Sequence, residues 1–295
     1  MAARILDGKS LAADLRAEVA AAVAEWQAAT GRAPGLAVVL VGDDPASRSY
    51  VTAKEKACAA AGIRSREIQL PASAAKADVL AAVRALNADD AVDGILVQLP
   101  LPEAAIEREV IEAVDPAKDV DGFHPTNVGR MVLGLPAFVP CTPAGVVELL
   151  RRAGVALAGA SVVVIGRSQI VGRPLSILLS QKGVDATVTL CHTRTRDLAR
   201  FTRAADVVVV AAGRPGTLPA AMVKPGAVVI DVGVNRVPDA SKATGYRLAG
   251  DVDFAAVAEK AAAITPVPGG VGPLTIAMLL KNTLEAARRR RGAGA

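Results

Sequence analysis

The sequence predicts an α/β protein of two domains, and three observations support this fold class. The chain has 295 residues, which is enough for two domains of ordinary size. Short apolar runs alternate with segments of helical periodicity, as is typical of parallel sheets covered by helices. The alternation lapses between residues 115 and 143, where Pro, Gly, Asp and Thr predominate. We therefore expect two successive α/β domains joined in this region.

The order of the elements follows from periodicity and from turn residues. The first series is expected to contain a helix over 11–26, a strand over 36–41, a helix over 46–61, a strand over 63–70, a helix over 75–87 and a short buried strand over 94–99. In the second series a helix begins near Pro143, and strands are expected over 161–165, 186–190, 206–211 and 227–231, before a long final helix over 271–291.

The predicted domain boundaries follow from this order. The first domain covers 1–140 and is joined by the final helix at about 272–295. The second domain covers 141–271, and we expect the active-site cleft between the two domains.

Composition restricts the function classes. Hydrophobic residues make up 52% of the chain and aromatic residues only 2%, so aliphatic contacts are expected to form the cores. The net charge of +5 depends largely on the arginine run at 288–291. We interpret that run as a solvated, frayed helix end rather than a surface for acidic partners, and we expect no nucleic-acid partner.

Several features are typical of a soluble cytoplasmic protein. The first ten residues place charges where a signal peptide needs apolar residues, and no apolar run approaches the length that spans a membrane. Cys58, Cys141 and Cys191 are odd in number and widely spaced, which indicates reduced thiols. The only histidines, His124 and His192, lack the spacing of metal ligands, so no metal is expected.

A glycine turn, defined as residues 166–172, follows the predicted strand over 161–165. Gly166 allows a sharp turn from strand to helix, and Gly172 allows close packing of the helix that follows. The amides at the start of this helix are expected to offer unpaired donors to a phosphate. The usual dinucleotide fingerprint has glycine where this chain has Ser168 and Val171, so the turn is a variant.

The end of the next predicted strand bears on the choice of dinucleotide. In NAD-binding folds a carboxylate at this place binds the ribose 2′-hydroxyl, but this chain has Thr193 and Arg194 there. Together with Arg167 in the glycine turn, they suit a 2′-phosphate, and the pattern favours NADP. The alternative is that both arginines are ordinary solvated side chains.

The candidate catalytic residues precede the glycine turn. Tyr50 and Lys54 lie four residues apart on a predicted helix, and a buried lysine beside a phenol can exchange protons near neutral pH. Gln98 lies at the carboxyl end of a predicted strand, where open α/β sheets bind ligands. Asp121 lies near Asp119 in the predicted junction. Alone, the Tyr-Lys pair also fits any exposed helix, and the Asp-Gly sequence also fits a simple turn.

Together these motifs resemble the bifunctional methylenetetrahydrofolate dehydrogenase/methenyltetrahydrofolate cyclohydrolase family, over nearly the whole chain. Seven motifs occur in the order found in that family. They are Ser49-Tyr50-Val-Thr-Ala-Lys54, Asp93-Gly-Ile-Leu-Val-Gln-Leu-Pro100, Lys118-Asp-Val-Asp-Gly122, Pro140-Cys-Thr-Pro143, Gly166-Arg-Ser-x-x-Val-Gly-x-Pro174, Asp231-Val-Gly-Val-Asn-Arg236 and Pro268-Gly-Gly-Val-Gly-Pro273.

The resemblance implies two reactions of one-carbon metabolism on tetrahydrofolate derivatives. The first is oxidation of 5,10-methylenetetrahydrofolate to 5,10-methenyltetrahydrofolate with NADP, and the second is hydrolysis of that product to 10-formyltetrahydrofolate. The resemblance also implies that Lys54 is the central acid/base residue and that Gln98 and Asp121 tune it and hold the pterin. Tyr50 would lie beside the folate.

The resemblance further implies binding residues and an assembly. Those expected at the substrate are Tyr50, Lys54, Val97, Gln98, Leu99, Pro268, Gly269, Gly270 and Ile276. Those expected at the cofactor are Gly166, Arg167, Ser168, Gly172, Thr193, Arg194 and Val234. Thr193 stands where some relatives have serine. A homodimer formed through the second domain is also expected.

Two alternative functions fit parts of the pattern. Short-chain dehydrogenases use a Tyr-x-x-x-Lys pair, but there the pair follows the glycine turn within one domain, whereas Tyr50 and Lys54 precede it in a separate α/β unit. A non-catalytic nucleotide-sensing module would keep the glycine turn and lose Lys54 or Gln98, and both residues are present.

Overall fold

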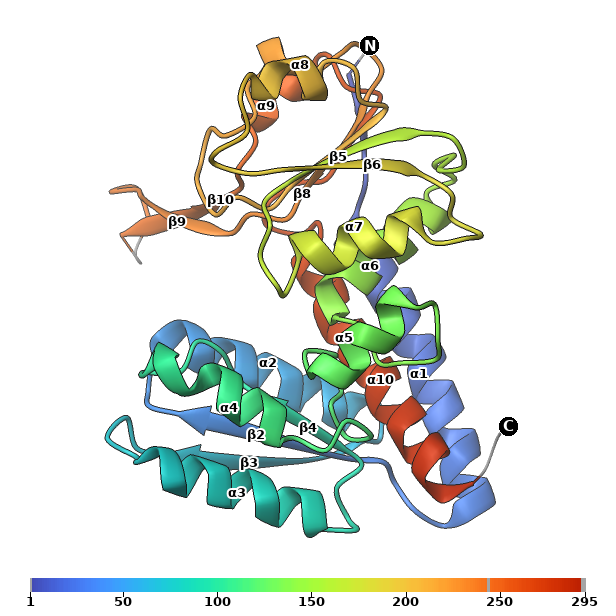
Figure 1. The fold of residues 1–295 in the computed structure, drawn as a ribbon, viewed down its shortest axis with the longest axis vertical. Helices are drawn as coiled ribbons and strands as arrows, with labels where there is room; N and C mark the ends of the chain where they lie inside the picture. Colours follow the sequence, from blue (N-terminus) through green and yellow to red (C-terminus); the bar gives the residue numbers. More distant parts are fainter. Residues whose placement is uncertain (1, 243–244, 293–295) are drawn as a thin grey trace. The chain divides into compact units, whose positions relative to one another are not determined.

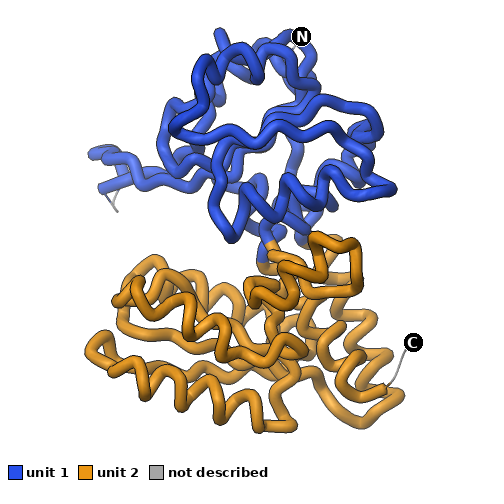
Figure 2. The backbone as a smooth tube through the Cα atoms, in the orientation of Figure 1, with its two compact units in different colours: residues 1–12, 142–275 blue, residues 13–141, 276–295 orange. Residues whose placement is uncertain are grey.

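The computed structural model describes residues 2–242 and 245–292, and its chain divides into two compact units. Unit 1 comprises residues 1–12 and 142–275, and unit 2 comprises residues 13–141 and 276–295 (Figure 2). Figure 1 labels those helices and strands of both units for which there is room. Each unit has its own parallel sheet, so the predicted α/β fold class with two domains is confirmed.

The sheet of unit 2 has three parallel strands in the order β3-β2-β4. They are β2 (Gly35–Val41), β3 (Arg64–Leu70) and β4 (Gly94–Val97). The central strand, β2, is buried at every residue, which explains why its sequence is a continuous apolar run. Because the strands are parallel, the carboxyl ends of β2 and β4 meet at one edge of the sheet. Gln98 follows β4 at that edge.

Helices cover the sheet of unit 2. The helices that lie wholly or mostly in unit 2 are, in chain order, α1 (Gly8–Thr30), α2 (Pro45–Ala60), α3 (Lys76–Ala88), the 3-10 helix η1 (Ala104–Ile106), α4 (Glu107–Ala113), α5 (Pro125–Val132) and α10 (Gly272–Arg291). Asp44 caps α2 by accepting the backbone N–H of Ser47 at 2.8 Å, and Pro45 occupies the first turn. Within 2–242 and 245–292, no helix has the length and apolarity to cross a membrane.

Unit 1 contains a six-stranded parallel sheet in the order β1-β11-β8-β7-β5-β6. Its strands are β1 (Arg4–Ile5), β5 (Ser161–Ile165), β6 (Thr187–Cys191), β7 (Val207–Val210), β8 (Val228–Asp231) and β11 (Ala263–Ile264). β6 and β7 pair with opposite sides of β5, so the strand order reverses there. Ligands of open α/β sheets bind outside the carboxyl ends of the strands at such a switch point. The carboxyl ends of β5 and β7 therefore form the expected ligand edge.

The remaining elements of unit 1 connect these strands. Its helices are α6 (Cys141–Arg152), α7 (Gly172–Ser180), α8 (Leu198–Thr202), the 3-10 helix η2 (Ala220–Met222) and α9 (Phe254–Ala258). An antiparallel hairpin of β9 (Asn235–Pro238) and β10 (Tyr246–Ala249) forms a separate small sheet. The Arg236 guanidinium lies 4.9 Å from the centre of the Tyr246 ring, a cation–π contact across this hairpin.

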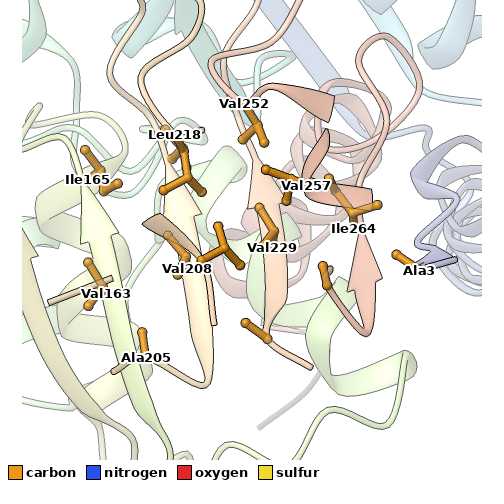
Figure 3. Close-up of a cluster of buried hydrophobic side chains, with 14 of the residues drawn as sticks. Ala3, Val163, Ile165, Ala205, Val208, Leu218, Val229, Val252, Val257 and Ile264 are labelled. Atoms are coloured by element: carbon orange, nitrogen blue, oxygen red, sulfur yellow. The ribbon is translucent and has the colours of Figure 1, made fainter. Parts of the chain in front are cut away.

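The core on one face of the unit 1 sheet is built almost entirely from valine, leucine, isoleucine and alanine (Figure 3). Val163, Val208 and Val229 come from three neighbouring strands and are each at most 1% exposed. Burying a side chain of this size contributes about 1.5–3 kcal/mol before opposing terms. Ala3, from the start of the chain, belongs to the same cluster.

The start of the chain differs from the predicted boundaries. β1 pairs with β11 in parallel, with Arg4 opposite Ala263, so residues 1–12 group with unit 1 and not with the first domain. A strand of two residues leaves no periodicity in the sequence, and only its long-range partner defines it. The segment over 115–143, expected to be irregular, contains the helix α5.

The arginine run at the end of α10 also differs from expectation. Arg290 donates from Nη1 to the Val92 carbonyl at 2.6 Å, and Nη2 of Arg291 lies 2.7 Å from Oδ1 of Asp93. The Asp93 side chain has no exposed surface, and a buried carboxylate needs such partners. The prediction of a solvated, frayed end is therefore wrong for Arg290 and Arg291. Their guanidinium groups pair with the buried carboxylate of Asp93, which directly precedes β4.

Candidate active site

Lys54 and Gln98 meet in unit 2. Lys54 lies on α2 with only 8% of its surface exposed, and its Nζ donates to Oε1 of Gln98 at 2.9 Å. The backbone N–H of Gln98 donates to the Val39 carbonyl, which continues the β2–β4 pairing one residue past β4. Nε2 of Gln98 donates to the Leu99 carbonyl at 2.8 Å, so the amide oxygen is directed toward the lysine. The structure therefore brings together two residues predicted from separate elements.

Asp121 is electrostatically coupled to this lysine. Burial lowers the pKa of Lys54 from its usual value, and the negative charge of Asp121 opposes that effect. Burial raises the pKa of Asp121 to about 6, against the opposing influence of Lys54. A lysine whose pKa is lowered and a carboxyl whose pKa is raised are suited to exchanging protons with a ligand. We call Lys54, Gln98 and Asp121 the Lys54 cluster.

The loop that carries Asp121 is held in place by two other residues of the same motif, Lys118 and Asp119. Lys118, only 1% exposed, donates from Nζ to three backbone carbonyls at the end of α3 at 2.6–2.9 Å. Asp119 accepts from Nδ2 of Asn127 at 2.9 Å and from the backbone N–H of His124 at 2.8 Å. Lys118 and Asp119 therefore shape the loop, and Asp121 is the residue of this motif whose charge acts most on Lys54.

The other residues predicted at the substrate differ in how accessible they are. Tyr50 lies one helical turn before Lys54 and is 45% exposed, so its ring is accessible. Val97 is only 7% exposed and belongs to the core between the sheet and helices α3 and α4, and Leu99 packs against that core. Their side chains hold the strand end in place, so a substrate would meet mainly their backbone groups.

Sequence reasoning missed one residue that supports the Lys54 cluster. Nδ2 of Asn282, on α10, donates to the carbonyls of Val120 at 2.8 Å and Val139 at 3.3 Å. Val120 directly precedes Asp121, and the thiol of Cys141 also donates to its carbonyl. No local pattern marks Asn282, because its partners lie more than a hundred residues earlier in the chain.

In unit 1 the glycine turn has the geometry that its spacing predicts. Gly166 follows β5 with φ +120°, and a Cβ there would lie 2.1 Å from the Ala211 carbonyl oxygen. A Cβ on Gly172 would lie 1.8 Å from the carbonyl oxygen of Gly166. Only glycine fits either position, so the backbone of the turn packs directly against the segment that follows β7.

The amides at the start of α7 differ from expectation. The Ser168 hydroxyl accepts the N–H groups of Val171 at 3.1 Å and Gly172 at 3.4 Å, and the Ser168 carbonyl accepts that of Arg173 at 3.1 Å. The prediction of unpaired donors is therefore wrong for these three amides. The serine that replaces a fingerprint glycine satisfies them within the chain.

The residues predicted at the cofactor fit a dinucleotide that carries a 2′-phosphate. Arg167, Thr193 and Arg194 are exposed, and Val234 is 49% exposed. The backbone N–H of Arg194 donates to Nδ1 of His192, which forms a compact turn after β6. The absence of side chains at the two glycines of the turn would let a phosphate approach the backbone after β5. The guanidinium groups of Arg167 and Arg194 supply positive charge.

A cavity of about 360 Å³ opens at the opposite, amino-terminal edge of the unit 1 sheet. Its lining includes Arg4, Asp206, Val207 and Val228. Lys224 already pairs with Asp206 there, at 2.5 Å. Because open α/β sheets bind ligands at the carboxyl ends of their strands, this cavity does not lie where a dinucleotide is expected.

The proline- and glycine-rich segment at 268–273 lies in unit 1 against the start of the chain. Lys9 donates its backbone N–H to the Gly269 carbonyl at 2.9 Å, and a Cβ on Gly8 would lie 1.7 Å from the Gly270 carbonyl oxygen. Pro268 belongs to the same segment, whereas Ile276 is the first residue of α10 that groups with unit 2.

Comparison with known proteins identifies both parts of the chain. Residues 6–121 match the family model described as tetrahydrofolate dehydrogenase/cyclohydrolase, catalytic domain, and residues 140–291 match that of its NAD(P)-binding domain. A separate catalytic domain before the nucleotide-binding domain does not fit a short-chain dehydrogenase or a nucleotide-sensing module. The bifunctional protein FolD of Geotalea uraniireducens is 57% identical over 288 residues, which cover 98% of this chain and 100% of that protein.

Solved structures agree with this match. The FolD methylenetetrahydrofolate dehydrogenase/cyclohydrolase from Campylobacter jejuni has a TM-score of 0.92 at 47% identity, covering 98% of this chain and 100% of that chain. The Trypanosoma brucei enzyme, complexed with NADP cofactor and inhibitor, has a TM-score of 0.94 at 43% identity, covering 98% of this chain and 99% of that chain. The resemblance carried by the seven motifs is confirmed, and the chain belongs to the tetrahydrofolate dehydrogenase/cyclohydrolase family.

Proposed function

We propose that the protein is an NADP-dependent methylenetetrahydrofolate dehydrogenase and methenyltetrahydrofolate cyclohydrolase. It oxidises 5,10-methylenetetrahydrofolate to the 5,10-methenyl compound and hydrolyses this product to 10-formyltetrahydrofolate. The observation that carries the proposal is the 2.9 Å contact between Nζ of the buried Lys54 and Oε1 of Gln98, in a chain of this family.

Hydrolysis is the step that most needs the Lys54 cluster. The oxygen of water bonds to the methenyl carbon and loses one proton, which gives a neutral carbinol. The carbinol hydroxyl then loses its remaining proton as the C=O bond forms and the bond from that carbon to N5 breaks. N5 takes up one proton, and the other is released to solvent. Lys54 in its neutral form accepts a proton and returns it, because burial lowers its pKa. Gln98 holds Nζ in place, and the charge of Asp121 raises the pKa of the lysine against the larger effect of burial.

The folate is proposed to lie beside Tyr50, whose exposed ring offers a stacking surface for an aromatic ligand. The remaining proposed substrate contacts are Val97, Leu99, Pro268, Gly269, Gly270 and Ile276. The family resemblance supports these contacts, as does the position of Gln98 at a carboxyl strand end.

The dinucleotide is proposed to bind at the carboxyl edge of the unit 1 sheet. When bound, NADP supplies a hydride acceptor for the methylene carbon. Gly166, Ser168 and Gly172 would shape the turn under the phosphates, and Val234 would contact the cofactor from the segment after β8. Arg167, Thr193 and Arg194 would surround the 2′-phosphate, for which their exposure and charge are suited.

The assembly and cellular compartment are also proposals. The family resemblance supports a homodimer formed through unit 1, which sedimentation of the purified protein would test. Cys58, Cys141 and Cys191 are all free, which supports a reducing compartment such as the cytoplasm.

The proposal is tested with the purified protein and both substrates. Oxidation of methylenetetrahydrofolate is measured with NADP⁺ and, separately, with NAD⁺, and hydrolysis of methenyltetrahydrofolate is measured without dinucleotide. We expect both activities, with kcat/KM for NADP⁺ about tenfold or more above that for NAD⁺. Absence of both activities would contradict the proposed function, whereas a preference for NAD⁺ would overturn only the choice of cofactor.

A further inference from the structure

Two segments at the ligand edge of unit 1 are tied to one buried carboxylate, that of Asp251. This residue has no exposed surface. Its Oδ2 accepts the backbone N–H groups of Ala212 at 2.7 Å and Gly213 at 2.8 Å, and its Oδ1 accepts Nδ2 of Asn235 at 2.9 Å. The Asp251 carboxylate thus joins the segment after β7 to the segment after β8.

A second buried carboxylate holds the first one in place. Oδ1 of Asp231, at the end of β8, accepts the backbone N–H groups of Gly233 and of Asp251, both at 3.0 Å. Oδ2 of Asp231 accepts the N–H of Val252 at 2.9 Å. Asp231 is 3% exposed, so both carboxylates are removed from water and depend on these donors.

The backbone is shaped to admit both carboxyl groups. A Cβ on Gly233 would lie 2.3 Å from the carboxyl carbon of Asp251, and a Cβ on Gly250 would lie 1.8 Å from Oδ2 of Asp231. Two neighbouring buried carboxylates are a costly way to fix loops, since both charges are removed from water. Burial and the nearby charge of Asp251 both raise the pKa of Asp231, which lies at about 6.

The segments held in this way lie at the switch point of the sheet. Ala212 and Gly213 follow β7, and the carboxyl ends of β5 and β7 are where the strand order reverses. The neighbouring Ala211 carbonyl packs against Gly166 of the glycine turn. Val234 lies between Gly233 and Asn235 and is 49% exposed. The same carboxylate therefore sets the position of the backbone segments that follow two neighbouring strands, β7 and β8, at the edge where the dinucleotide is expected.

We propose that Asp251 is a positioning residue for the dinucleotide, which fixes the segments around Ala212 and Val234 in the binding-competent arrangement without touching the ligand itself. The inference rests on the proposed cofactor function of unit 1. Asp231 supports this role, because its Oδ1 accepts the backbone N–H of Asp251 and so fixes the backbone that carries the Asp251 carboxylate.

The variant Asp251→Asn tests the proposal. The new amide must direct its NH₂ group either at the N–H groups of Ala212 and Gly213 or at the NH₂ group of Asn235, so one contact becomes a donor facing a donor. We expect the Kd for NADP⁺, measured by titration calorimetry, to rise about tenfold or more. Hydrolysis of methenyltetrahydrofolate without dinucleotide should change less than about twofold. Amide hydrogen exchange at Ala212 and Gly213 should become faster.

Two further variants sharpen the test. Exchanging the pair, as Asn235→Asp with Asp251→Asn, restores a donor facing an acceptor, and we expect most of the lost NADP⁺ affinity to return. Asp253→Asn is the matched control, because Asp253 is an exposed cap of α9 two residues away, and its Kd should stay unchanged. If Asp251→Asn does not fold, Asn235→Ala removes one contact of the carboxylate and should still weaken NADP⁺ binding about threefold.

The outcomes separate this inference from the function on which it rests. Unchanged NADP⁺ affinity in a folded Asp251→Asn protein, or in Asn235→Ala where the former does not fold, overturns the positioning role while the cofactor function stands. Equal loss of hydrolysis and of NADP⁺ affinity, without recovery in the exchanged pair, also overturns it in favour of a general role in folding. If the unsubstituted protein binds no dinucleotide, the proposed cofactor function fails first and the inference falls with it.

Discussion

The Lys54 cluster of unit 2 and the glycine turn of unit 1 are built from different parts of the chain. The Lys54 cluster uses side chains, and its properties come from burial and from charges that shift the pKa values of Lys54 and Asp121. The glycine turn uses the backbone, and its geometry depends on the absence of side chains at Gly166 and Gly172. Electrostatics therefore determines the properties of the Lys54 cluster, whereas steric room for the backbone determines the geometry of the glycine turn.

This difference predicts how each region responds to substitution. A change in the Lys54 cluster alters proton transfer while leaving dinucleotide affinity intact. A change in the glycine turn adds atoms where the backbone has no room, so it alters dinucleotide affinity and spares the hydrolysis that needs no dinucleotide. Substitutions at Lys54 and Gly172 test that separation.

The largest effect is expected for Lys54→Met, which keeps the length and apolar stem of the side chain and removes its titratable group. Hydrolysis of methenyltetrahydrofolate should fall by about a thousandfold, the usual contribution of a general acid/base. The measurement is the loss of methenyl absorbance with time. Lys56→Met, an exposed lysine on the same helix, is the control and should retain full activity. Hydrolysis at the normal rate by folded Lys54→Met protein would refute the role of this lysine.

A somewhat smaller effect is expected for Gly172→Ala. The added Cβ would lie 1.8 Å from the Gly166 carbonyl oxygen, so the turn must shift to accept it. We expect the Kd for NADP⁺ to rise about a hundredfold, while hydrolysis without dinucleotide changes less than about threefold. Gly129→Ala, in α5 where a Cβ meets nothing within 4 Å, should leave both properties unchanged. Loss of hydrolysis in Gly172→Ala would show that the two regions do not act separately.

A change in pH dependence is expected for Asp121→Asn. The charge of Asp121 raises the pKa of Lys54, so its removal should lower that pKa further. If Lys54 accepts the proton of water, the acid limb of kcat/KM for hydrolysis moves to lower pH, and the rate near neutral pH falls by about tenfold through loss of the carboxyl itself. The pH–rate profile provides the measurement. An acid limb that stays in place or moves to higher pH would contradict the coupling.

The smallest effect on activity is expected for Arg290→Ala, which instead changes stability. It removes one of the two guanidinium groups that bind the fully buried Asp93, and the free energy of unfolding should fall by about 1–3 kcal/mol. Urea unfolding can be followed through the fluorescence of Trp26, which is buried in unit 2. Arg84→Ala, an exposed arginine of α3, should cost less than about 0.5 kcal/mol. Equal stability of the two variants would restore the interpretation of a solvated tail.

Sequence reasoning located most elements of the fold because their patterns are local. The strand expected over 36–41 is β2, and that over 161–165 is β5 with the same bounds. β1 and β11 were not predicted, since each has two residues and exists only through pairing with distant strands. The hairpin of β9 and β10 was missed as well, because its strands are short and half exposed and carry little periodicity.

The candidate site could be predicted in part for the same reason. Lys54, Gln98 and the glycine turn lie in motifs whose spacing can be read directly from the chain. Asn282 and Asp251 could not be predicted, because their roles depend on carbonyl and amide groups that only the folded chain brings near them. The occupied amides at the start of α7 were also hidden, since they depend on which way the Ser168 hydroxyl turns.

The most direct test of the separation between the two regions is a titration of NADP⁺ into the Lys54→Met protein by calorimetry. We predict a Kd within about twofold of the unsubstituted protein, although hydrolysis is lost. A Kd weakened as much as that of Gly172→Ala would mean that Lys54 supports dinucleotide binding, and the division of chemistry and cofactor binding between the units would be wrong.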